Sequence, residues 1–294
     1  MSWQEQLISL YLFISKHYEK DLSHYCSRMS NYADLSFSDE EVIVIFIFGI
    51  LRKQKELKSV YQYTRDHLSE WFPKLPSYVA FIQRLNKVAD VFIPLVELLL
   101  TQYPKKISYL NNSLLMDSMP IMLAQRGRRF HAKVAPDIAT KNGYCATKKL
   151  HYYGVKLHVV GRHKNGCLPM PEYVGLTDAG MNDNKAFEQI VSCLNNDDVY
   201  ADKAYTDTFY HEKGQFNLLT PVKKQKGQDF LDAADQALST AVSRVRQPIE
   251  SFFNWLEQKT SIQIASKVRS YQGLIVHVFG RISAALFAIV GFCS

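Results

Sequence analysis

One carboxylate inside a short apolar stretch constrains this chain more than any other feature. Asp117 lies within Leu-Leu-Met-Asp-Ser-Met-Pro-Ile, residues 114–121, between a turn-like Asn-Asn-Ser and a basic segment. A run of this length and composition predicts a central, buried β-strand. A carboxylate buried there must be hydrogen-bonded, ion-paired or bound to a cation. We therefore predict that Asp117 is a metal ligand.

The basic residues of the chain are concentrated around that stretch. Residues 105–170 contain 12 Lys/Arg against 2 Asp/Glu, whereas residues 1–104 contain 11 against 12 and residues 171–294 contain 12 against 14. Most of the formal net charge of +7 therefore comes from one segment. Such a concentration indicates a polyanionic partner, and a solvated basic surface is the alternative.

Cysteine usage and hydropathy favour a cytoplasmic protein. The five cysteines are odd in number and widely scattered, which argues against a disulfide framework or a zinc site and for a reducing compartment. No cationic leader precedes an apolar core, so we predict no signal peptide. The apolar run Val42–Leu51 is too short to span a membrane, and Leu274–Phe292 is interrupted by His277 and Arg281. Both are expected to be core helices, with no role at a membrane.

Residues 1–104 are predicted to form a mostly helical domain. Ser38 and Glu41 make a capping box that opens an apolar helix. Further along, a helix, a turn and a second helix beginning after Ser77 follow one another. The second of these helices carries Arg84 and Lys87, whose side chains can reach phosphates and base edges. A helix-turn-helix-like DNA reader and an ordinary helical hairpin with a polar outer face both fit this pattern.

After residue 104 the hydrophobic period changes from helical to extended, so we place a domain boundary there and assign residues 105–294 to a second domain. Its pattern predicts a strand with Asp117, then a β-hairpin, and then helices alternating with strands. That order describes a mixed α/β sheet flanked by helices. The later elements are expected at Leu150–Val160, Cys167–Leu176, Lys185–Leu194, Val199–Asp202, a helix ending at Gly214, and Phe216–Val222.

Two further carboxylates can join Asp117. Asp202 ends a second apolar strand, and neighbouring strands lie about 4.8 Å apart, so both aspartates can face one site. Glu250 lies at the margin of an apolar helical stripe, and Pro248 either opens that helix or kinks a longer one. Three carboxylates without a cation would repel one another, whereas Mg²⁺ takes oxygen ligands. Asp178 and Asp183 precede a helix, where aspartate usually caps.

Five motifs in order resemble bacterial insertion-sequence transposases of the DDE type. They are Leu-Leu-Met-Asp117-Ser-Met-Pro-Ile, Lys149-Leu-His-Tyr-Tyr-Gly-Val-Lys156-Leu-His, Leu176-Thr-Asp-Ala-Gly-Met-Asn-Asp183, Tyr200-Ala-Asp202-Lys-Ala-Tyr205 and Arg246-Gln-Pro-Ile-Glu250-Ser-Phe-Phe-Asn-Trp-Leu. The resemblance implies a ribonuclease-H-like fold. It also implies that Asp117, Asp202 and Glu250 are catalytic and bind two Mg²⁺ ions, for which Mn²⁺ substitutes.

The resemblance implies metal-dependent hydrolysis of a phosphodiester at the ends of an element, followed by strand transfer into target DNA. The expected partners are double-stranded DNA, both terminal inverted repeats and target, and a second copy of the chain. Residues expected to contact DNA are Arg126, Arg128, Arg129, Lys156, Arg246, Lys259, Arg84 and Lys87. A metal-dependent nuclease without strand transfer and a catalytically decayed DNA-binding regulator remain as alternatives.

The chain departs from the family pattern at one position. Several relatives carry a lysine seven residues after the glutamate, on the same helical face, to hold DNA. Here that position is Glu257, and the nearest basic residue after it is Lys259. Arg246 or Lys259 is therefore expected to replace the missing lysine.

Overall fold

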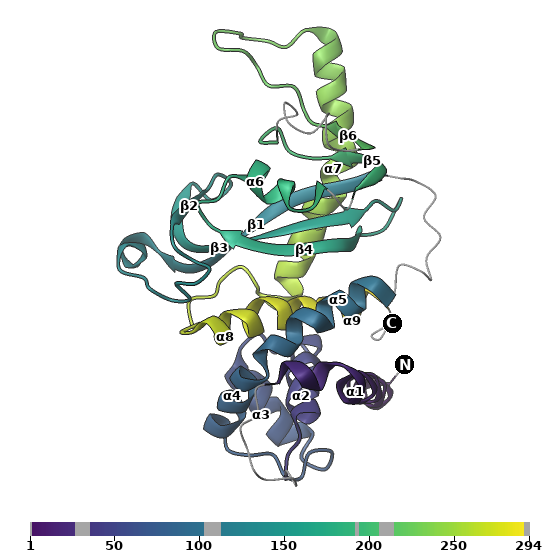
Figure 1. The fold of residues 1–294 in the computed structure, drawn as a ribbon, viewed down its shortest axis with the longest axis vertical. Helices are drawn as coiled ribbons and strands as arrows, with labels where there is room; N and C mark the ends of the chain where they lie inside the picture. Colours follow the sequence, from purple (N-terminus) through teal and green to yellow (C-terminus); the bar gives the residue numbers. More distant parts are fainter. Residues whose placement is uncertain (1, 27–35, 103–112, 192–193, 206–214, 291–294) are drawn as a thin grey trace. The chain divides into compact units, whose positions relative to one another are not determined.

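The computed structural model describes residues 2–26, 36–102, 113–191, 194–205 and 215–290 (Figure 1). Helices come first, strands follow, and helices close the chain. The elements are α1 Trp3–Lys20, α2 Asp39–Leu51, α3 Leu57–His67, α4 Tyr78–Lys87, α5 Phe92–Gln102, β1 Ser113–Gln125, β2 Asn142–Cys145, β3 Leu150–Arg162, β4 Met170–Asp178, α6 Asp183–Glu188, β5 Asn195–Tyr200, β6 Gln215–Leu219, α7 Ala233–Thr260, α8 Tyr271–Ile275 and α9 Arg281–Ile289. Short 3₁₀ segments lie at Leu22–Tyr25, Ala89–Val91 and Arg126–Phe130, and a π-helical turn lies at Val276–Gly280.

The chain divides into two compact units. One comprises Met1–Tyr103 with Leu256–Ser294, and the other comprises Pro104–Trp255. Residues 256–294, which we expect in the second domain, therefore pack with the N-terminal helices. A packing unit need not be an independently folding domain. The boundaries 1–104 and 105–294 accordingly stay a prediction.

Helix α2 is the centre of the helical unit. Ser38 and Glu41 form the predicted capping box at its start, with the Ser38 hydroxyl accepting from the Glu41 N–H and the Glu41 carboxylate accepting from the Ser38 N–H. Residues 42–48 are all buried, and the helix contacts α1, α3, α4 and α9. A helix that is apolar on every side is stable in water only when other elements surround it.

The C-terminal apolar helix belongs to the same unit. By length and composition the segment Tyr271–Ile289 could cross a membrane, yet 72% of its apolar window is buried inside the structure. Arg281 lies in this segment, is itself buried, and donates to the carbonyls of Thr260 and Lys55. This burial is what a core helix of a soluble protein shows.

The second unit is built on a mixed sheet with the strand order β2-β3-β1-β5-β6. β1 pairs antiparallel with β3 and parallel with β5, and β5 pairs parallel with β6. β4 pairs antiparallel with β3, next to the stretch of β3 that pairs with β2. Helices α6 and α7 lie on opposite faces of this sheet (Figure 1). The arrangement confirms the predicted mixed α/β, ribonuclease-H-like fold.

The element boundaries refine the sequence predictions at two places. Pro248 lies inside α7, so of the two alternatives the longer helix is correct. The helix expected over Lys185–Leu194 is limited to α6, Asp183–Glu188. The helix expected to end at Gly214 lies outside the described residues. Periodicity located α6 and α7, but it could not set their ends.

A glycine permits the close pairing of β1 with β3. Gly154 lies at an irregularity in the ladder, where the register shifts between Met122 and Ala124. A Cβ atom on Gly154 would come within 2.1 Å of the Ile121 carbonyl oxygen. That oxygen belongs to the backbone of the central strand and cannot move away without breaking the ladder.

Gly154→Ala is therefore expected to destabilise the protein and to lower its melting temperature by about 5 °C or more. Gly175→Ala on β4 is the matched control, because a Cβ there meets nothing within 4 Å. Thermal unfolding of both variants followed by circular dichroism checks this. Equal melting temperatures for the two variants would contradict it.

Candidate active site

Asp117 lies in the middle of β1, the strand that joins the antiparallel and parallel halves of the sheet. Its side chain is 22% exposed. One carboxylate oxygen accepts from the Ser118 backbone N–H at 2.8 Å, and the other accepts from Arg246 Nη1 at 2.9 Å. The predicted buried strand and the predicted need for a charged partner are both present.

Asp202 comes two residues after the end of β5, the parallel neighbour of β1. The register pairs Leu115 with Tyr200, and continuing it by two residues sets Asp117 beside Asp202. The Asp202 carboxylate accepts from the Lys203 N–H at 2.7 Å. The parallel pairing of β1 with β5 thus brings both aspartates to neighbouring positions in the sheet.

Glu250 comes from α7. Ile249, Phe252 and Phe253 bury one side of this helix, while the Glu250 side chain is 52% exposed. Arg246, one helical turn earlier, donates to the Glu250 carboxylate and to Asp117 at the same time. Its guanidinium is the physical link between β1 and α7.

Burial dominates the electrostatics of Asp117. Desolvation raises its pKa to about 6, and the negative charge of Asp202 contributes to the rise. Arg246 and the Ser118 N–H act in the opposite direction but do not cancel it. Asp117 is therefore a carboxylate whose charge is only partly compensated by the protein, and a cation would compensate it further.

The three predicted ligands do not converge on one point. In the described parts of the chain, no group of three or more His, Cys, Asp or Glu side chains is close enough to hold a metal ion. Asp117 and Asp202 are close enough to interact, but Arg246 stands between Asp117 and Glu250. The chemistry of the donors fits Mg²⁺, since all are carboxylate oxygens and one is incompletely neutralised. Completing the set requires Arg246 to release Glu250.

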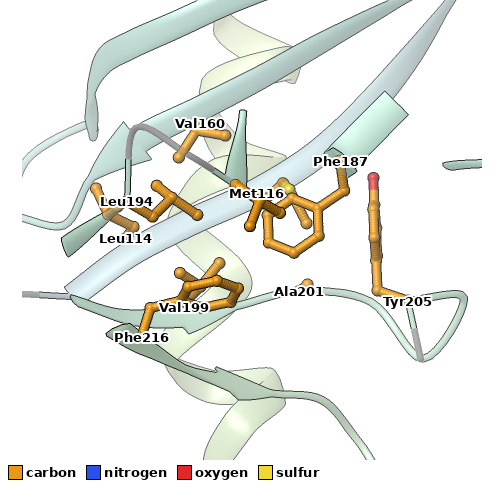
Figure 2. Packing of buried hydrophobic residues seen from close by; sticks show 10 residues of the cluster. Leu114, Met116, Val160, Phe187, Leu194, Val199, Ala201, Tyr205 and Phe216 are labelled. Atoms are coloured by element: carbon orange, nitrogen blue, oxygen red, sulfur yellow. The ribbon is translucent and has the colours of Figure 1, made fainter. Parts of the chain in front are cut away.

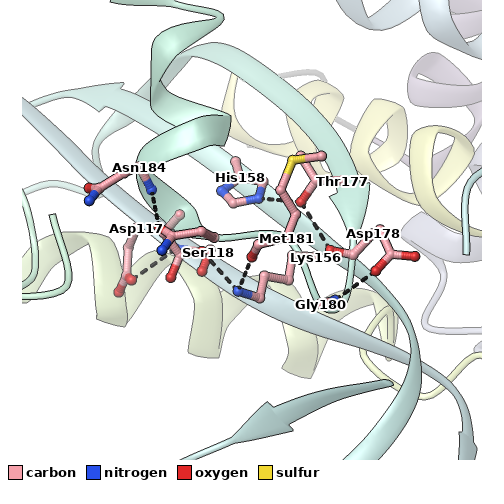
Figure 3. A network of polar contacts seen from close by, with 11 residues as sticks. Asp117, Ser118, Lys156, His158, Thr177, Asp178, Gly180, Met181 and Asn184 are labelled. Carbon is pink, nitrogen blue, oxygen red and sulfur yellow. Dashed lines mark hydrogen bonds and ion pairs between the residues drawn. The ribbon is translucent and has the colours of Figure 1, made fainter. Parts of the chain in front are cut away.

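A second polar network lies beside Asp117 on β3 and β4 (Figure 3). Lys156 Nζ donates to the Met181 carbonyl at 2.9 Å and pairs with Asp183 at 3.0 Å. His158 contacts Thr177 Oγ1 at 2.7 Å, and burial lowers its pKa to about 4, so it is neutral at pH 7. Lys156 is thus ion-paired rather than solvated. Its predicted contact with DNA is untested.

The other predicted DNA contacts lie at different places. Arg126 and Arg128 are exposed on the 3₁₀ turn after β1, where Arg129 lies over the Phe130 ring at 4.3 Å. In the helical unit Arg84 pairs with the buried Asp39 at 2.8 Å. Lys87 and Lys259 are exposed. Arg84 therefore has a structural partner, and the helix-turn-helix interpretation remains open beside the helical hairpin.

Glu257, which stands where relatives carry lysine, has a structural contact. Its carboxylate accepts from the Gln263 backbone N–H at 2.8 Å, in the turn that follows α7. The side chain thus closes the turn after the helix.

Two features near the carboxylates were not predicted from the sequence. Asp183 was expected to cap α6, but Asn182 is the N-cap and Asp183 pairs with Lys156. Tyr205 belongs to one of the five motifs, and its buried side chain feels the charges of Asp117 and Asp202. The spacing Asp202-Lys-Ala-Tyr205, a single turn after a strand, was the available signal.

Asp178 does organise a loop, accepting from the N–H groups of Thr140, Lys141 and Gly180.

Comparison with known proteins identifies the family. A family model described as a transposase DDE domain matches residues 112–287, which is more than half of the chain. The chain belongs to this family. No curated protein and no solved structure matches it. The match confirms the resemblance to insertion-sequence DDE transposases and connects the chain with DNA transposition and recombination. Members of the family are enzymes that act on DNA and generally use divalent metal ions.

The raised pKa of Asp117 predicts a pH dependence of stability in the absence of metal. An unfolded aspartate titrates near pH 4, and folded Asp117 titrates near pH 6. Its contribution to the free energy of unfolding is thus complete below about pH 4 and is lost as the pH rises through about 6. In EDTA, the melting temperature of the wild type relative to Asp117→Asn should therefore fall over this range.

Asp178→Asn provides a control of opposite sign. Burial raises the pKa of Asp178, but hydrogen bonds from Thr140, Gly180 and Lys141 outweigh burial and lower it overall. The wild type should therefore gain stability relative to Asp178→Asn as the pH rises through the acid range. Parallel profiles for wild type and Asp117→Asn would contradict the assignment for Asp117.

Proposed function

We propose that this protein is the DNA transposase of an insertion sequence and that it cuts phosphodiester bonds at the ends of the element and joins them to target DNA. The observation that carries the proposal is the arrangement around Asp117. Asp117 within β1 lies beside Asp202, which follows the parallel neighbour β5, and Arg246 links Asp117 to Glu250. The family to which the chain belongs supports the same activity.

Asp117, Asp202 and Glu250 would hold two Mg²⁺ ions, with Mn²⁺ as a substitute. When bound, such ions activate the attacking oxygen and stabilise the leaving oxygen of a phosphodiester. Asp117 is held in place by the Ser118 N–H, so its carboxylate is oriented before any ligand arrives. Arg246 balances Asp117 and Glu250 without metal, and its guanidinium becomes free for a DNA phosphate once they bind cations.

The exposed arginines after β1 would hold the DNA. Arg126 and Arg128 are exposed, and the Arg129 guanidinium is kept near them by the Phe130 ring. Lys156, Lys87, Arg84 and Lys259 are further proposed contacts, with Lys156 and Arg84 first leaving their ion pairs. Two element ends must be held together for transposition, so we propose a homodimer on paired inverted repeats, acting in the cytoplasm at the nucleoid.

Asp117→Asn is expected to abolish Mg²⁺-dependent cleavage of duplex DNA that carries the sequences flanking the gene. The rate should fall by more than the roughly 10- to 100-fold that a change beside a metal ligand produces. DNA binding, measured by fluorescence anisotropy, should be retained. Asp137→Asn, which changes an exposed carboxylate of the same unit, is the matched control.

The products of the same reaction distinguish the alternative functions. Cleavage followed by joined product supports a transposase, and cleavage without joining indicates a nuclease. A wild-type protein that binds DNA but does not cut it with Mg²⁺ or Mn²⁺ indicates a regulator. Undiminished cleavage by Asp117→Asn would show that the proposed site is wrong.

The combined change Arg126→Ala and Arg128→Ala should weaken DNA binding and reduce its dependence on salt. Each lost phosphate contact lowers the slope of log K against log salt concentration by about 0.9. Loss of both arginines should therefore lower this slope by about 2. Lys16→Ala with Lys20→Ala, two exposed lysines of the helical unit, is the control. Equal slopes for both double variants would argue against this DNA-binding surface.

A further inference from the structure

Two aromatic side chains are exposed at one end of the sheet. Phe130, on the 3₁₀ turn after β1, is 66% exposed, and Tyr144, on β2, is 53% exposed. The Arg129 guanidinium lies over the Phe130 ring, 4.3 Å from its centroid, and the ring centroids of Tyr144 and His151 are 4.8 Å apart. We call these four side chains the aromatic surface. Each exposed ring is therefore paired with a side chain that contains nitrogen.

The pairing of three strands brings the two exposed rings to the same region. Tyr152 of β3 pairs with Gln125 on β1 and with Gly143 on β2. Neighbouring strands lie about 4.8 Å apart, so Gln125 and Gly143 are about 10 Å apart. The turn that carries Phe130 begins directly after Gln125, and Tyr144 directly follows Gly143. The two parts of the aromatic surface thus start from neighbouring points of the sheet.

The tyrosine and histidine of the aromatic surface share a sheet face with Asp117. Asp117 pairs with Val159 of β3, and Tyr144 pairs with His151 of the same strand. Paired residues project to the same side of a sheet, and so do residues of one strand that are an even number of positions apart. Positions 151 and 159 meet this condition. The two pairs therefore project from the same face.

The opposite face is closed by the core. Met116 and Val160 pair with each other one position from Asp117, so their side chains project to the other side of the sheet. Both belong to a buried cluster with Phe187 of α6 (Figure 2). A ligand of Asp117 therefore approaches over the face that carries the tyrosine and histidine pair.

The separation along β3 determines what the aromatic surface can contact. Antiparallel strands rise about 3.4 Å per residue, so the distance from position 151 to position 159 is about 27 Å. DNA rises by about 3.4 Å per base pair, so this length corresponds to about eight base pairs. The aromatic surface is thus too distant to touch a phosphate held at Asp117, and it contacts a different part of the same DNA.

The loop that precedes β2 is fixed to the sheet. The Tyr153 hydroxyl donates to the backbone carbonyls of Val134 and Ala139. The Asp178 carboxylate at the end of β4 accepts from the Thr140 N–H. The 3₁₀ turn itself contacts β1 and β3. Rings on anchored segments lose little conformational freedom on binding, which favours their use as contacts.

Basic side chains surround the two rings. Residues 126–151 contain 7 Lys/Arg against 1 Asp/Glu. The exposed lysines and arginines among them are Arg126, Arg128, Lys133, Lys141, Lys148 and Lys149. Sites for single-stranded nucleic acid combine a basic surface with aromatic rings on which bases stack. Bases inside a duplex are covered on both faces by their neighbours, so exposed rings add to binding only where bases are unstacked.

We propose that the aromatic surface binds unpaired bases of DNA, with Phe130 and Tyr144 as the rings on which these bases stack. The proposal rests on the proposed function, which makes DNA the nucleic acid, and it adds a preference for DNA with a single-stranded segment. The basic side chains contact the phosphates of paired and unpaired DNA alike, whereas the rings distinguish the two.

The combined change Phe130→Ala and Tyr144→Ala tests the proposal, because both side chains are exposed and neither carries a charge. The probes are a blunt duplex, the same duplex with a single-stranded tail of thymidines, and the same duplex with an abasic tail of equal length. Binding to the full chain is measured by fluorescence anisotropy in EDTA. The wild type should bind the thymidine tail about tenfold more tightly than the abasic tail, which has the same phosphates but no bases. The double variant should bind both tails equally.

Two further measurements separate stacking from loss of charge or of folding. The double variant removes no phosphate contact, so its slope of log K against log salt concentration should equal that of the wild type. Its affinity for the blunt duplex should also be unchanged. Tyr25→Ala combined with Phe230→Ala is the matched control, since these side chains are 50% and 84% exposed but lie outside the aromatic surface. This control should keep the preference for the thymidine tail.

The inference and the proposed function can fail separately. If the wild type binds both tails equally, or if the control variant also loses the preference, the inference is wrong. If a tail of uridine ribonucleotides binds more tightly than the thymidine tail, the surface serves RNA and the assignment to DNA is wrong. A protein that cuts and joins DNA without distinguishing the tails overturns the inference and leaves the proposed function. A protein that shows the preference but does not cut DNA supports the inference and overturns the proposed function.

Discussion

The hydrogen-bonded ion pair between Arg246 and Asp117 joins the central strand of the second unit to its long helix α7. A buried carboxylate in the central strand of a sheet destabilises the fold unless a cationic group pairs with it. Here Arg246 of α7 is that group. Arg246 also binds Glu250, so one guanidinium balances two acids that belong to different elements. Because this side chain pairs with acids of both the sheet and the helix, the positions of Asp117 and Glu250 relative to each other depend on it.

The sequence allowed the strands and the family to be predicted because these depend on local patterns. An apolar run with one acid predicted β1, alternation predicted the β3–β4 hairpin, and a capping box predicted the start of α2. The parallel pairing of β1 with β5 then aligned Asp117 with Asp202, as an acid inside one apolar strand and an acid at the end of another had suggested.

The contacts between distant side chains could not be predicted from those patterns. Lys156 on a strand face could have been solvated, and only the tertiary fold brings Asp183 within 3.0 Å of it. Glu257 bonds to a backbone N–H six residues later, in a turn that periodicity does not describe. The packing of residues 256–294 with the N-terminal helices likewise depends on burial between segments far apart in sequence, about which local propensity carries no information.

The parallel pairing of β1 with β5 also has a kinetic consequence. Parallel neighbours need a long crossover, and here the antiparallel hairpin and α6 lie between the two strands. Closing so long a loop is slow compared with forming a hairpin, and α7 comes later still in the chain. We therefore expect the acidic residues to come together late in folding. A partly synthesised or partly folded chain would expose the basic segment to DNA before it had assembled the groups proposed to cut it.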